Sequence, residues 1–431
     1  MLNIKNRNKR VFIVDFDAIS PIGIGRNDIY QNLERDYCNE TVLEEFSNSN
    51  IPFFIGAKIP PVKDVNFPND LFAEIALYDR KFYLLYAIFQ LMRERLELMC
   101  NLVPTHKKGV VLGVGADVIP FHLFSKEVQK SISANKNPYN ELIINLNKEK
   151  GFLNTIWNPY DIHSLFIAEQ LSLGAFQKTI LTACTASTQA ILSGYYSIQN
   201  CMADMVVVGG TDSILNPLAF ISFGKLGVIP EHNDMNSNTC KPFDMNRNGT
   251  LAGEAAGLAI LASEEVCRSH NLQPKYELKG GASTLDAYKI TAPDPGGVSI
   301  EKCLHKCLQH ANWKPGDVDY IHAHGTGTKL NDSIELKAIH KVFGEKASEV
   351  PISSTKDRHG HAIGAAGVQE LVVSLLALDN GFIPSNRNLQ TPLKPEMNLV
   401  RKNRKKQLKR IIMNNFAFGG VNTVLAIENQ A

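Results

Sequence analysis

The sequence predicts an α/β fold of alternating strands and helices, and three observations support this class. Short apolar runs typical of buried strands alternate with helical patterns through both halves of the chain. The length of 431 residues is enough for two similar cores packed together. Each half also has one stretch dense in small residues, Ala183 to Ala190 and Gly364 to Gly367, so we expect a distant internal duplication.

Local patterns predict the N-terminal elements. Arg10 to Phe16 is an apolar run typical of a buried strand, and a turn rich in helix breakers follows it. A helix is expected over Asn27 to Leu33, capped at or near its first residue. The proline-containing region 38–70 is expected to be a surface loop. The pattern of Leu71 to Met99 predicts a long helix with an interruption near Asp79.

Later segments continue the alternation. Strands are predicted at Gly109 to Gly115, Met205 to Gly210, Leu258 to Leu261, Asp319 to Ala323 and Ile411 to Asn415, and helices at Asp161 to Leu173 and Gly367 to Leu378. The polar, lysine-rich segment Phe121 to Asn154 is expected to form a helical cap over a cleft, and Lys241 to Gly257 a turn-rich loop. We divide the chain into an N-terminal half, 1–270, and a C-terminal half, 271–431.

The composition excludes several classes of protein. With 44% hydrophobic and 20% charged residues, the chain has the make-up of an ordinary soluble globular protein. A formal net charge of +2 excludes polyanion binding driven by bulk charge alone. The basic run Arg401 to Arg410 is expected to be a solvated loop rather than a partner-binding patch, so no nucleic-acid partner is predicted.

The cysteines and the apolar runs predict where the protein works. The eight cysteines are scattered without a CxxC pair, so we expect neither a metal site nor disulfides, and a reducing, cytoplasmic location. The N-terminus lacks the apolar core of a signal peptide. No apolar run is expected to span a membrane.

The stretch Ile180 to Leu192, ILTACTASTQAIL, predicts a strand, a tight turn and a buried helix. Cys184 would then lie at a helix N-terminus. Unpaired backbone N–H groups and the helix dipole favour a thiolate at such a position and can hold an oxyanion. Cys184 is therefore a candidate nucleophile, and the alternative is a buried structural cysteine.

Two histidines lie in similar glycine-bordered turns. His324 directly follows a predicted strand and precedes Gly325-Thr326-Gly327-Thr328, a turn whose backbone can approach a ligand closely. His361 lies just before the small-residue helix. Each histidine alone is compatible with a structural role. One cysteine and two histidines in three such turns instead predict one shared catalytic site.

Several longer motifs surround these residues. They are Thr182-Ala183-Cys184-Thr185, Gly209-Gly210-Thr211-Asp212, Phe243-Asp244 with Arg247 and Gly249, Gly253-Glu254, His324-Gly325-Thr326-Gly327-Thr328 with Asp332 and Glu335, Lys356 with His361, Gly364-Ala365-Ala366-Gly367, and Asn415-Phe416-Ala417-Phe418-Gly419-Gly420-Val421-Asn422. In this order the motifs resemble those of the β-ketoacyl-acyl carrier protein synthases of the thiolase superfamily, which include the ketosynthases of type II polyketide assembly. The resemblance extends over nearly the whole chain.

This resemblance implies a thiolase fold, in which two βαβαβαββ halves form a five-layered αβαβα sandwich, usually as a homodimer. It implies an acyltransferase that condenses malonyl-acyl carrier protein with an acyl chain bound to Cys184, in fatty acid, polyketide or polyene synthesis. No cofactor is implied, because the substrates are carried on the phosphopantetheine arm of the carrier protein. The implied partners are this acyl carrier protein and a second identical or related subunit.

The resemblance also implies residue roles. His324 and His361 would stabilise the enolate formed by decarboxylation, and the N–H groups of Cys184 and Phe418 would form an oxyanion hole. Lys356, near the histidines and Glu370, would set the local electrostatics. Phe418 would also act as a gate. Thr326, Thr328 and Thr291 would line the pantetheine arm, and Asp332 and Glu335 would be structural. Because carrier proteins are usually acidic, Arg80, Lys81 and Lys225 are candidate contacts.

The sequence departs from the family pattern at four places. Val14 to Asp17 replaces a glycine-containing turn signature, Ala255 and Ala417 each replace a glycine, and Asn331 precedes Asp332. These departures leave the pathway open between fatty acid and secondary-metabolite synthesis. A non-catalytic subunit that determines chain length remains the alternative function, although such subunits lack the reactive cysteine. A degradative thiolase would need a second catalytic cysteine near the C-terminus, and the last cysteine is Cys307.

Overall fold

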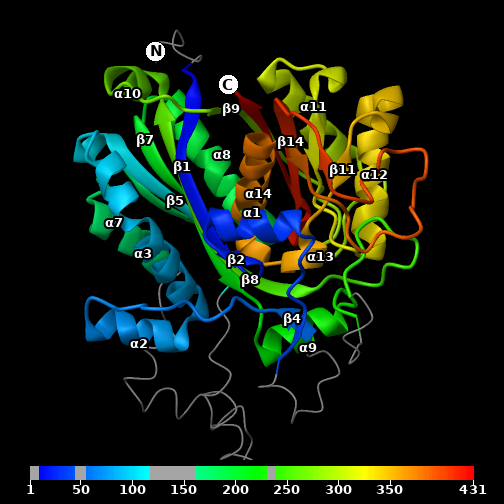
Figure 1. Cartoon of the computed structure of the whole chain (residues 1–431), viewed down its shortest axis with the longest axis horizontal. Coiled ribbons are helices and arrows are strands. Elements are labelled where there is room, and N and C mark those ends of the chain that lie inside the picture. Colours follow the sequence, from blue (N-terminus) through cyan, green and yellow to red (C-terminus); the bar gives the residue numbers. More distant parts are fainter. Residues whose placement is uncertain (1–8, 44–54, 117–160, 231–238) are drawn as a thin grey trace, which may run out of the picture.

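The computed structural model describes residues 9–43, 55–116, 161–230 and 239–431 (Figure 1). Its main sheet runs in the order β11-β10-β14-β15-β9-β1-β8-β7-β5-β6. The first half contributes β1 (Val11–Ser20), β5 (Lys108–Val114), β6 (Gln177–Ile180), β7 (Met205–Ser213) and β8 (Ala252–Ser263). The second half contributes β9 (Tyr276–Leu285), β10 (Tyr320–His322), β11 (Ile352–Ser353), β14 (Arg410–Phe416) and β15 (Val421–Asn429).

The two halves of the sheet have the same topology. Counted from its own first strand, each half has the strand order 3-2-4-5-1. In both halves the second strand is parallel to the third and fourth, and the fifth is antiparallel to the fourth and first. β1 and β9 pair antiparallel and join the halves. This repeated order confirms the duplicated α/β fold that the sequence predicts.

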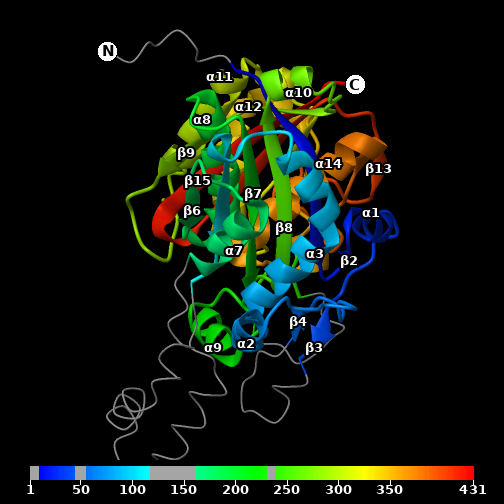
Figure 2. The ribbon, with the colours of Figure 1, turned by 90° about the vertical axis from the view of Figure 1, so that its left-hand side faces the viewer.

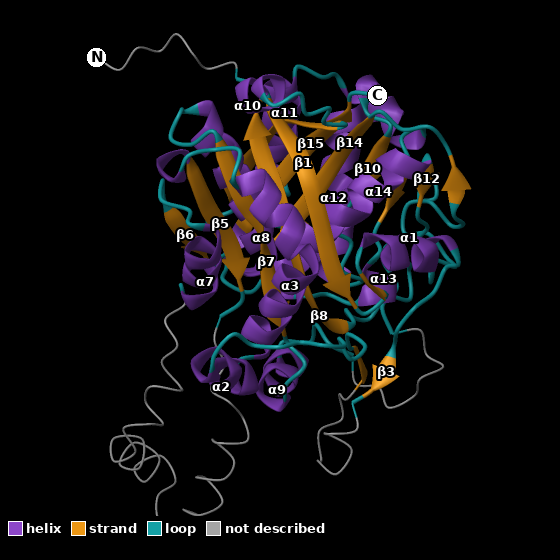
Figure 3. Ribbon diagram, turned by 60° about the vertical axis from the view of Figure 1, so that its left-hand side comes forward, coloured by secondary structure: helices purple, strands orange, loops and turns teal. Residues whose placement is uncertain are grey.

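Helices cover both faces of each half-sheet and complete the αβαβα arrangement (Figures 1 and 3). The outer helices of the first half are α3 (Arg80–Cys100) and α7 (Ile162–Leu171), the central helices are α8 (Ala186–Gln199) and α14 (Ala366–Asn380), and the outer helices of the second half are α11 (Val298–Ala311) and α12 (Lys329–Phe343). Three separate apolar clusters hold these layers together. The largest contains side chains of α8 and α14 together with strands of both halves.

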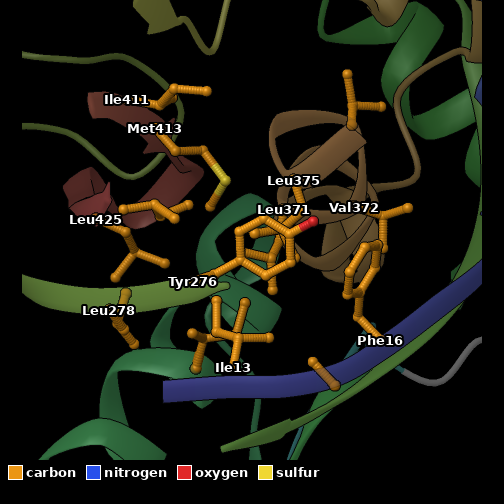
Figure 4. Close-up of a cluster of buried hydrophobic side chains, with 14 of the residues drawn as sticks. Ile13, Phe16, Tyr276, Leu278, Leu371, Val372, Leu375, Ile411, Met413 and Leu425 are labelled. Carbon is orange, nitrogen blue, oxygen red and sulfur yellow. The ribbon is translucent and has the colours of Figure 1, made fainter. Parts of the chain in front are cut away.

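Figure 4 shows where α14 packs between the two halves of the sheet. Leu371, Val372 and Leu375 of α14 face side chains of β1, β9 and β14. The rings of Phe16 on β1 and Tyr276 on β9 meet edge to face, with centroids 5.8 Å apart. Each large buried apolar side chain contributes about 1.5–3 kcal/mol, so this cluster holds the two halves as one body.

The small residues that begin α8 and α14 allow the two central helices to approach closely. A Cβ on Gly367 of α14 would lie 1.9 Å from Thr188 Oγ1 of α8, and one on Gly113 of β5 would lie 2.1 Å from the Ser187 nitrogen, so α8 also packs closely on this strand. The Ser187 hydroxyl accepts a hydrogen bond from the Val368 N–H, at 3.0 Å. The stretches dense in small residues therefore serve helix packing at the centre of the molecule.

Shorter elements complete the described chain. They are β2 (Gly23–Ile24), α1 (Arg26–Glu34), β3 (Thr41–Val42), β4 (Ile55–Ala57), α2 (Asp70–Tyr78), α9 (Pro217–Lys225), α10 (Glu264–Ser269), α13 (Lys356–His359), β12 (Phe382–Ile383) and β13 (Arg404–Lys405). The 3-10 turns are η3 (Thr105–Lys107), η4 (Ala183–Thr185), η6 (Pro315–Asp317), η7 (Gly344–Ser348), η8 (Ile363–Ala365) and η9 (Phe418–Gly420). Figure 2 places β3, β4, α2 and α9 at the end opposite the C-terminus.

Several local predictions are corrected by the structure. β8 begins at Ala252, inside the segment predicted as a loop, because its small residues hide the apolar signal of a strand. The region 38–70 contains β4, whose Gly56 pairs in parallel with Ala252. α1 begins at Arg26, and Gly25 rather than Asn27 occupies its cap. The predicted cap at 121–154 lies outside the described residues.

Two further expectations concern α3 and α14. The predicted interruption near Asp79 is confirmed, because Asp79 ends α2 and its carboxylate accepts a hydrogen bond from the Lys81 N–H at the start of α3. The expectation of no membrane-length apolar run is wrong by length and composition, since Ile363–Asn380 meets both criteria. In the fold, 83% of that stretch is buried inside the protein, where it forms the turn η8 and the central helix α14.

Candidate active site

Strained turns begin both central helices. η4 precedes α8 in the first half and η8 precedes α14 in the second half. Ala183 has φ 47° and Ile363 has φ 34°, values that are costly for residues with a side chain, above all a β-branched one. Cys184 directly follows Ala183, so the strained turn sets the direction of its thiol. The side chain of Cys184 is buried, with 6% of the residue exposed.

The three reactive side chains predicted from separate turns lie together. His361 Nε2 is 3.1 Å from Cys184 Sγ. The rings of His324 and His361 have centroids 5.4 Å apart and are nearly perpendicular. One atom from each of the three groups lies within 4.8 Å of the others. The site therefore combines one sulfur and two imidazoles around a common point.

Burial determines the resting protonation states of the cysteine and both histidines. It raises the pKa of the Cys184 thiol to about 12, although Lys356 and the N–H groups of Phe418 and Cys184 act in the opposite direction. The expectation that the turn favours a thiolate is therefore wrong, because desolvation outweighs the helix N-terminus. Burial, with the charge of Lys356, also lowers the pKa of His324 and His361 well below the usual value. The resting site holds a neutral thiol and two neutral imidazoles.

Lys356 and Glu370 form a buried ion pair next to His324. The Lys356 ammonium contacts a Glu370 carboxylate oxygen, donates to the His324 carbonyl at 2.6 Å and lies 3.3 Å from His324 Nδ1. Both side chains are almost fully buried, at 0% and 1% exposed. Burial raises the pKa of Glu370, and the adjacent ammonium counteracts this rise. The pair places a fixed positive charge beside the imidazole.

Two carboxylates shape the backbone around His324. Glu335 accepts hydrogen bonds from the N–H groups of His324 and Gly325, both at 2.8 Å. Asp332 accepts from the N–H groups of Phe243 and Gly327, at 2.8 and 3.2 Å. These contacts agree with the structural roles predicted for both carboxylates.

A cavity of about 290 Å³ leads to the three reactive groups. Thr326, Thr328 and Thr291, predicted to contact the pantetheine arm, all line it. The hydroxyls of Thr326 and Thr328 are 2.9 Å apart. The cavity therefore has a polar wall formed by these threonines.

Apolar side chains also line the cavity. Phe418 lies there and stacks on Phe223 of α9, with centroids 6.4 Å apart and rings 16° from parallel. Phe223 is an aromatic wall residue that the sequence motifs did not reveal, because α9 carries no motif. The N–H groups of Phe418 and Cys184 both lower the pKa of the Cys184 thiol, which makes them the candidate donors of an oxyanion hole.

The three residues predicted to contact the carrier protein differ in their ion pairing and exposure. Arg80 donates to Glu254 from Nε at 3.0 Å and from Nη2 at 2.7 Å. Lys81 is 7% exposed and its Nζ lies 3.6 Å from the Asp79 carboxylate. Lys81 is therefore buried and the prediction that it contacts a carrier protein is wrong, whereas the Arg80 side chain is 39% exposed and its contact with a carrier protein stays a prediction. Lys225, at the end of α9, is exposed.

Besides Phe223, sequence reasoning missed the role of Asn415 in the site. Asn415 was recognised only as part of a motif, yet its side chain contacts Glu370, His324 and Thr188. The available signal was the position of Asn415 in a predicted buried strand. A polar side chain buried beside a catalytic loop needs a hydrogen-bond partner.

The donor set of one thiol and two imidazoles has the composition of a zinc site with an open position. The neighbouring charge argues against a bound cation, because the buried ammonium of Lys356 lies beside His324. The neutral resting groups are instead arranged for proton transfer from sulfur to nitrogen.

An enzyme that transfers acyl groups through a thioester needs a nucleophilic sulfur, a base beside the sulfur and donors for the oxygen that becomes charged. Cys184, His361 and the candidate N–H donors of Cys184 and Phe418 match these parts, and all three residues line one cavity. The fold and the site thus define an acyl-transferring enzyme of the condensing type.

Comparison with known families agrees with this class. Residues 8–266 match the β-ketoacyl synthase N-terminal domain and residues 276–390 match the β-ketoacyl synthase C-terminal domain. The chain therefore belongs to the β-ketoacyl synthase family.

Individual relatives are similar over different shares of the chain. The 3-oxoacyl-[acyl-carrier-protein] synthase 2 of Synechocystis is 29% identical over 97% of this chain and 98% of its own length. The nodulation protein E of Rhizobium meliloti is 37% identical over 58% of this chain and 61% of its own length. The solved ishigamide ketosynthase/chain length factor superposes with a TM-score of 0.83 at 24% identity, covering 98% of this chain and 100% of that one. This last likeness concerns the fold.

Proposed function

We propose that this protein is a catalytically competent β-ketoacyl-acyl carrier protein synthase that performs decarboxylative Claisen condensation. The observation that carries the proposal is the 3.1 Å contact between His361 Nε2 and Cys184 Sγ, with His324 beside it in the same cavity. A subunit that only determines chain length would not need a thiol, a base and a second imidazole in this geometry.

The first half-reaction loads the acyl chain. His361 Nε2 accepts the thiol proton as the sulfur attacks the acyl thioester, and the N–H groups of Cys184 and Phe418 hold the oxyanion. When the intermediate collapses, the carrier thiol leaves with the proton from His361. The site regains a neutral imidazole, and the acyl chain remains bound as a thioester to Cys184.

The second half-reaction forms the carbon–carbon bond. A malonyl thioester loses CO₂, and the electron pair of the broken bond forms an enolate whose oxygen accepts a hydrogen bond from the Nε2–H of His324. The enolate carbon attacks the acyl carbonyl, and the bond between this carbonyl carbon and sulfur breaks. The thiolate that leaves takes up one proton from solvent and becomes the neutral thiol again.

An acidic carrier protein is the proposed donor of both substrates. The mouth of the cavity has exposed apolar side chains, Leu226 at 47% and Leu330 at 56% exposed, next to exposed Lys225 and Lys329. Apolar contacts surrounded by cations suit an acidic helical partner that delivers a long flexible arm. The three threonines that line the cavity support this proposal, because their hydroxyls offer hydrogen bonds to such an arm.

A second subunit is proposed to pair along β6. In the described chain this strand ends the sheet and pairs with β5 on one side only. Leu181, Tyr196 and Met202, which lie near β6 in sequence or structure, are exposed large side chains. An open sheet edge with apolar neighbours favours association with another chain, either identical or related.

The experiment that tests the proposed function follows labelled CO₂ release and product formation from malonyl- and acyl-carrier proteins. The wild type is expected to release CO₂ and form one β-ketoacyl product for each CO₂. Cys184→Ala is expected to form no condensation product, and His324→Ala to lose decarboxylation. A wild type that forms no product with any acyl chain from short to long contradicts the proposal.

Docking of the carrier protein has its own test. Lys225→Glu is expected to raise KM for carrier-bound substrates about tenfold and to change KM for small thioesters less than twofold, because only the carrier meets this surface. Lys302→Glu, on the outer helix α11, is the matched control and is expected to change neither value. Equal changes for both substrates would show that Lys225 does not contact the carrier.

A further inference from the structure

The amide of Asn415 lies at the centre of the polar network behind the active site. Its Nδ2 donates to Glu370 Oε2 at 2.7 Å and lies 3.4 Å from His324 Nδ1. Its Oδ1 accepts a hydrogen bond from the Thr188 hydroxyl at 2.6 Å. Asn415 is fully buried at the end of β14. One side chain therefore contacts the ion pair, a catalytic imidazole and a central helix.

The neighbours of Asn415 fix the orientation of its amide. Glu370 already receives the Lys356 ammonium on Oε1, so its other oxygen is an acceptor that needs a donor. The reverse orientation would place the amide oxygen of Asn415 against this carboxylate oxygen. Two acceptors facing each other in a buried site are unfavourable, so Nδ2 points towards Glu370 and His324.

This orientation determines which nitrogen of His324 carries the proton. Nδ1 faces two nitrogen donors, Lys356 Nζ at 3.3 Å and Asn415 Nδ2 at 3.4 Å. An ammonium has no lone pair and an amide nitrogen is not an acceptor, so Nδ1 must present its own lone pair. In the neutral imidazole the single proton then lies on Nε2. That N–H is the donor that an enolate oxygen requires.

We propose that Asn415 is a further positioning residue, which together with Lys356 holds His324 in the tautomer that donates from Nε2 to the enolate oxygen. The inference rests on the proposed function and deepens it by assigning a residue to the decarboxylation step. Asn415 also connects this step to the nucleophile, because Thr188 lies four residues after Cys184, on the helix that the nucleophile turn begins.

The rates of the two half-reactions distinguish a positioning role of Asn415 from a purely structural role. Acylation of Cys184 uses His361 as the base, whereas decarboxylation needs the Nε2 proton of His324. Loss of the Asn415 donor should therefore slow decarboxylation and leave acylation nearly unchanged. A residue that only stabilised the fold would change both rates by the same factor.

The test uses Asn415→Asp and Asn415→Leu, which remove the N–H donor at nearly constant volume. Malonyl decarboxylation is expected to fall at least tenfold, while the rate of Cys184 acylation changes less than threefold. Equal losses in both half-reactions, or decarboxylation within threefold of the wild type, would overturn the assignment of Asn415. Asn32→Asp is the matched control, because this amide on α1 donates to the Ile22 carbonyl away from the site.

A second variant keeps the inference testable if the Asn415 variants do not fold. Thr188→Val removes the hydroxyl that holds Asn415 Oδ1, and decarboxylation is expected to fall at least threefold with acylation unchanged. An unchanged decarboxylation rate in Thr188→Val would count against the proposal. Failure of the wild type to accept an acyl group would instead refute the proposed function, so the two failures are distinguishable.

Discussion

Removal of His361, the base beside Cys184, should strongly slow the reaction of the Cys184 thiol. In His361→Ala the thiol loses the acceptor that lies 3.1 Å from it. Burial raises the pKa of this thiol to about 12, so the thiolate forms only as the pH rises towards that value. At pH 8 about one molecule in ten thousand would carry the thiolate, compared with roughly a quarter for an ordinary cysteine.

The expected magnitude follows from these fractions. Alkylation of Cys184 by iodoacetamide in His361→Ala should be about a thousandfold slower at pH 8 than alkylation of an ordinary exposed thiol. The variant's rate should then rise about tenfold per pH unit from pH 7 to 10. In the wild type, His361 stays neutral because its pKa is lowered well below the usual value, so the rate should be flat from about pH 6 to 9.

Peptide mapping by mass spectrometry measures each cysteine separately. Cys201 is the internal reference, since it is the exposed cysteine among the eight. If Cys184 of His361→Ala reacts within tenfold of the wild-type rate at pH 8, His361 is not its base. A half-maximal rate below pH 9 in the variant would refute the argument that burial suppresses the thiolate.

Three further predictions concern stability and metals. Glu370→Gln leaves the Lys356 ammonium buried without a counter-charge, so it should lower the free energy of unfolding by about 3–5 kcal/mol. Denaturant titrations measure this change, and a loss under about 1 kcal/mol would contradict the ion pair. Gly367→Ala places a Cβ 1.9 Å from Thr188 Oγ1 and should lower the free energy of unfolding by at least about 1–3 kcal/mol. The control Gly316→Ala, whose Cβ would meet its nearest atom at 3.7 Å, should lower it by under about 0.5 kcal/mol. Similar losses in the two variants would refute the tight helix crossing. Exhaustive dialysis against a chelator should leave condensation activity unchanged, and activity that returns only when zinc is added would show that the thiol and imidazoles hold a metal.

The sequence was sufficient to predict the main elements of the fold. Apolar runs identified β1, β5, β7 and β14, and the interruption at Asp79 separated α2 from α3. The start of β8 could not be predicted, because Gly253, Ala255 and Gly257 give it neither alternation nor bulk. Its strand character comes from pairing with β1 and β7, which is a tertiary effect.

The sequence predicted the site residues that lie in recognisable motifs, but not their protonation states or their contacts. His324 and His361 come from glycine-bordered turns, and Cys184 from a strand-to-helix turn rich in small residues, all visible in the sequence. The protonation state of the cysteine was not predictable, because the helix N-terminus is local whereas the desolvation that opposes it comes from the packed protein. The role of Asn415 was equally hidden, since its three partners come from three other elements.

The central claim is that Cys184 carries the acyl chain, and mass spectrometry of the intact protein tests it most directly. After incubation with acyl-carrier protein, the wild type should gain the mass of one acyl group per chain, and Cys184→Ala should gain none. Absence of an adduct on the wild type, or an equal adduct on Cys184→Ala, would contradict the account.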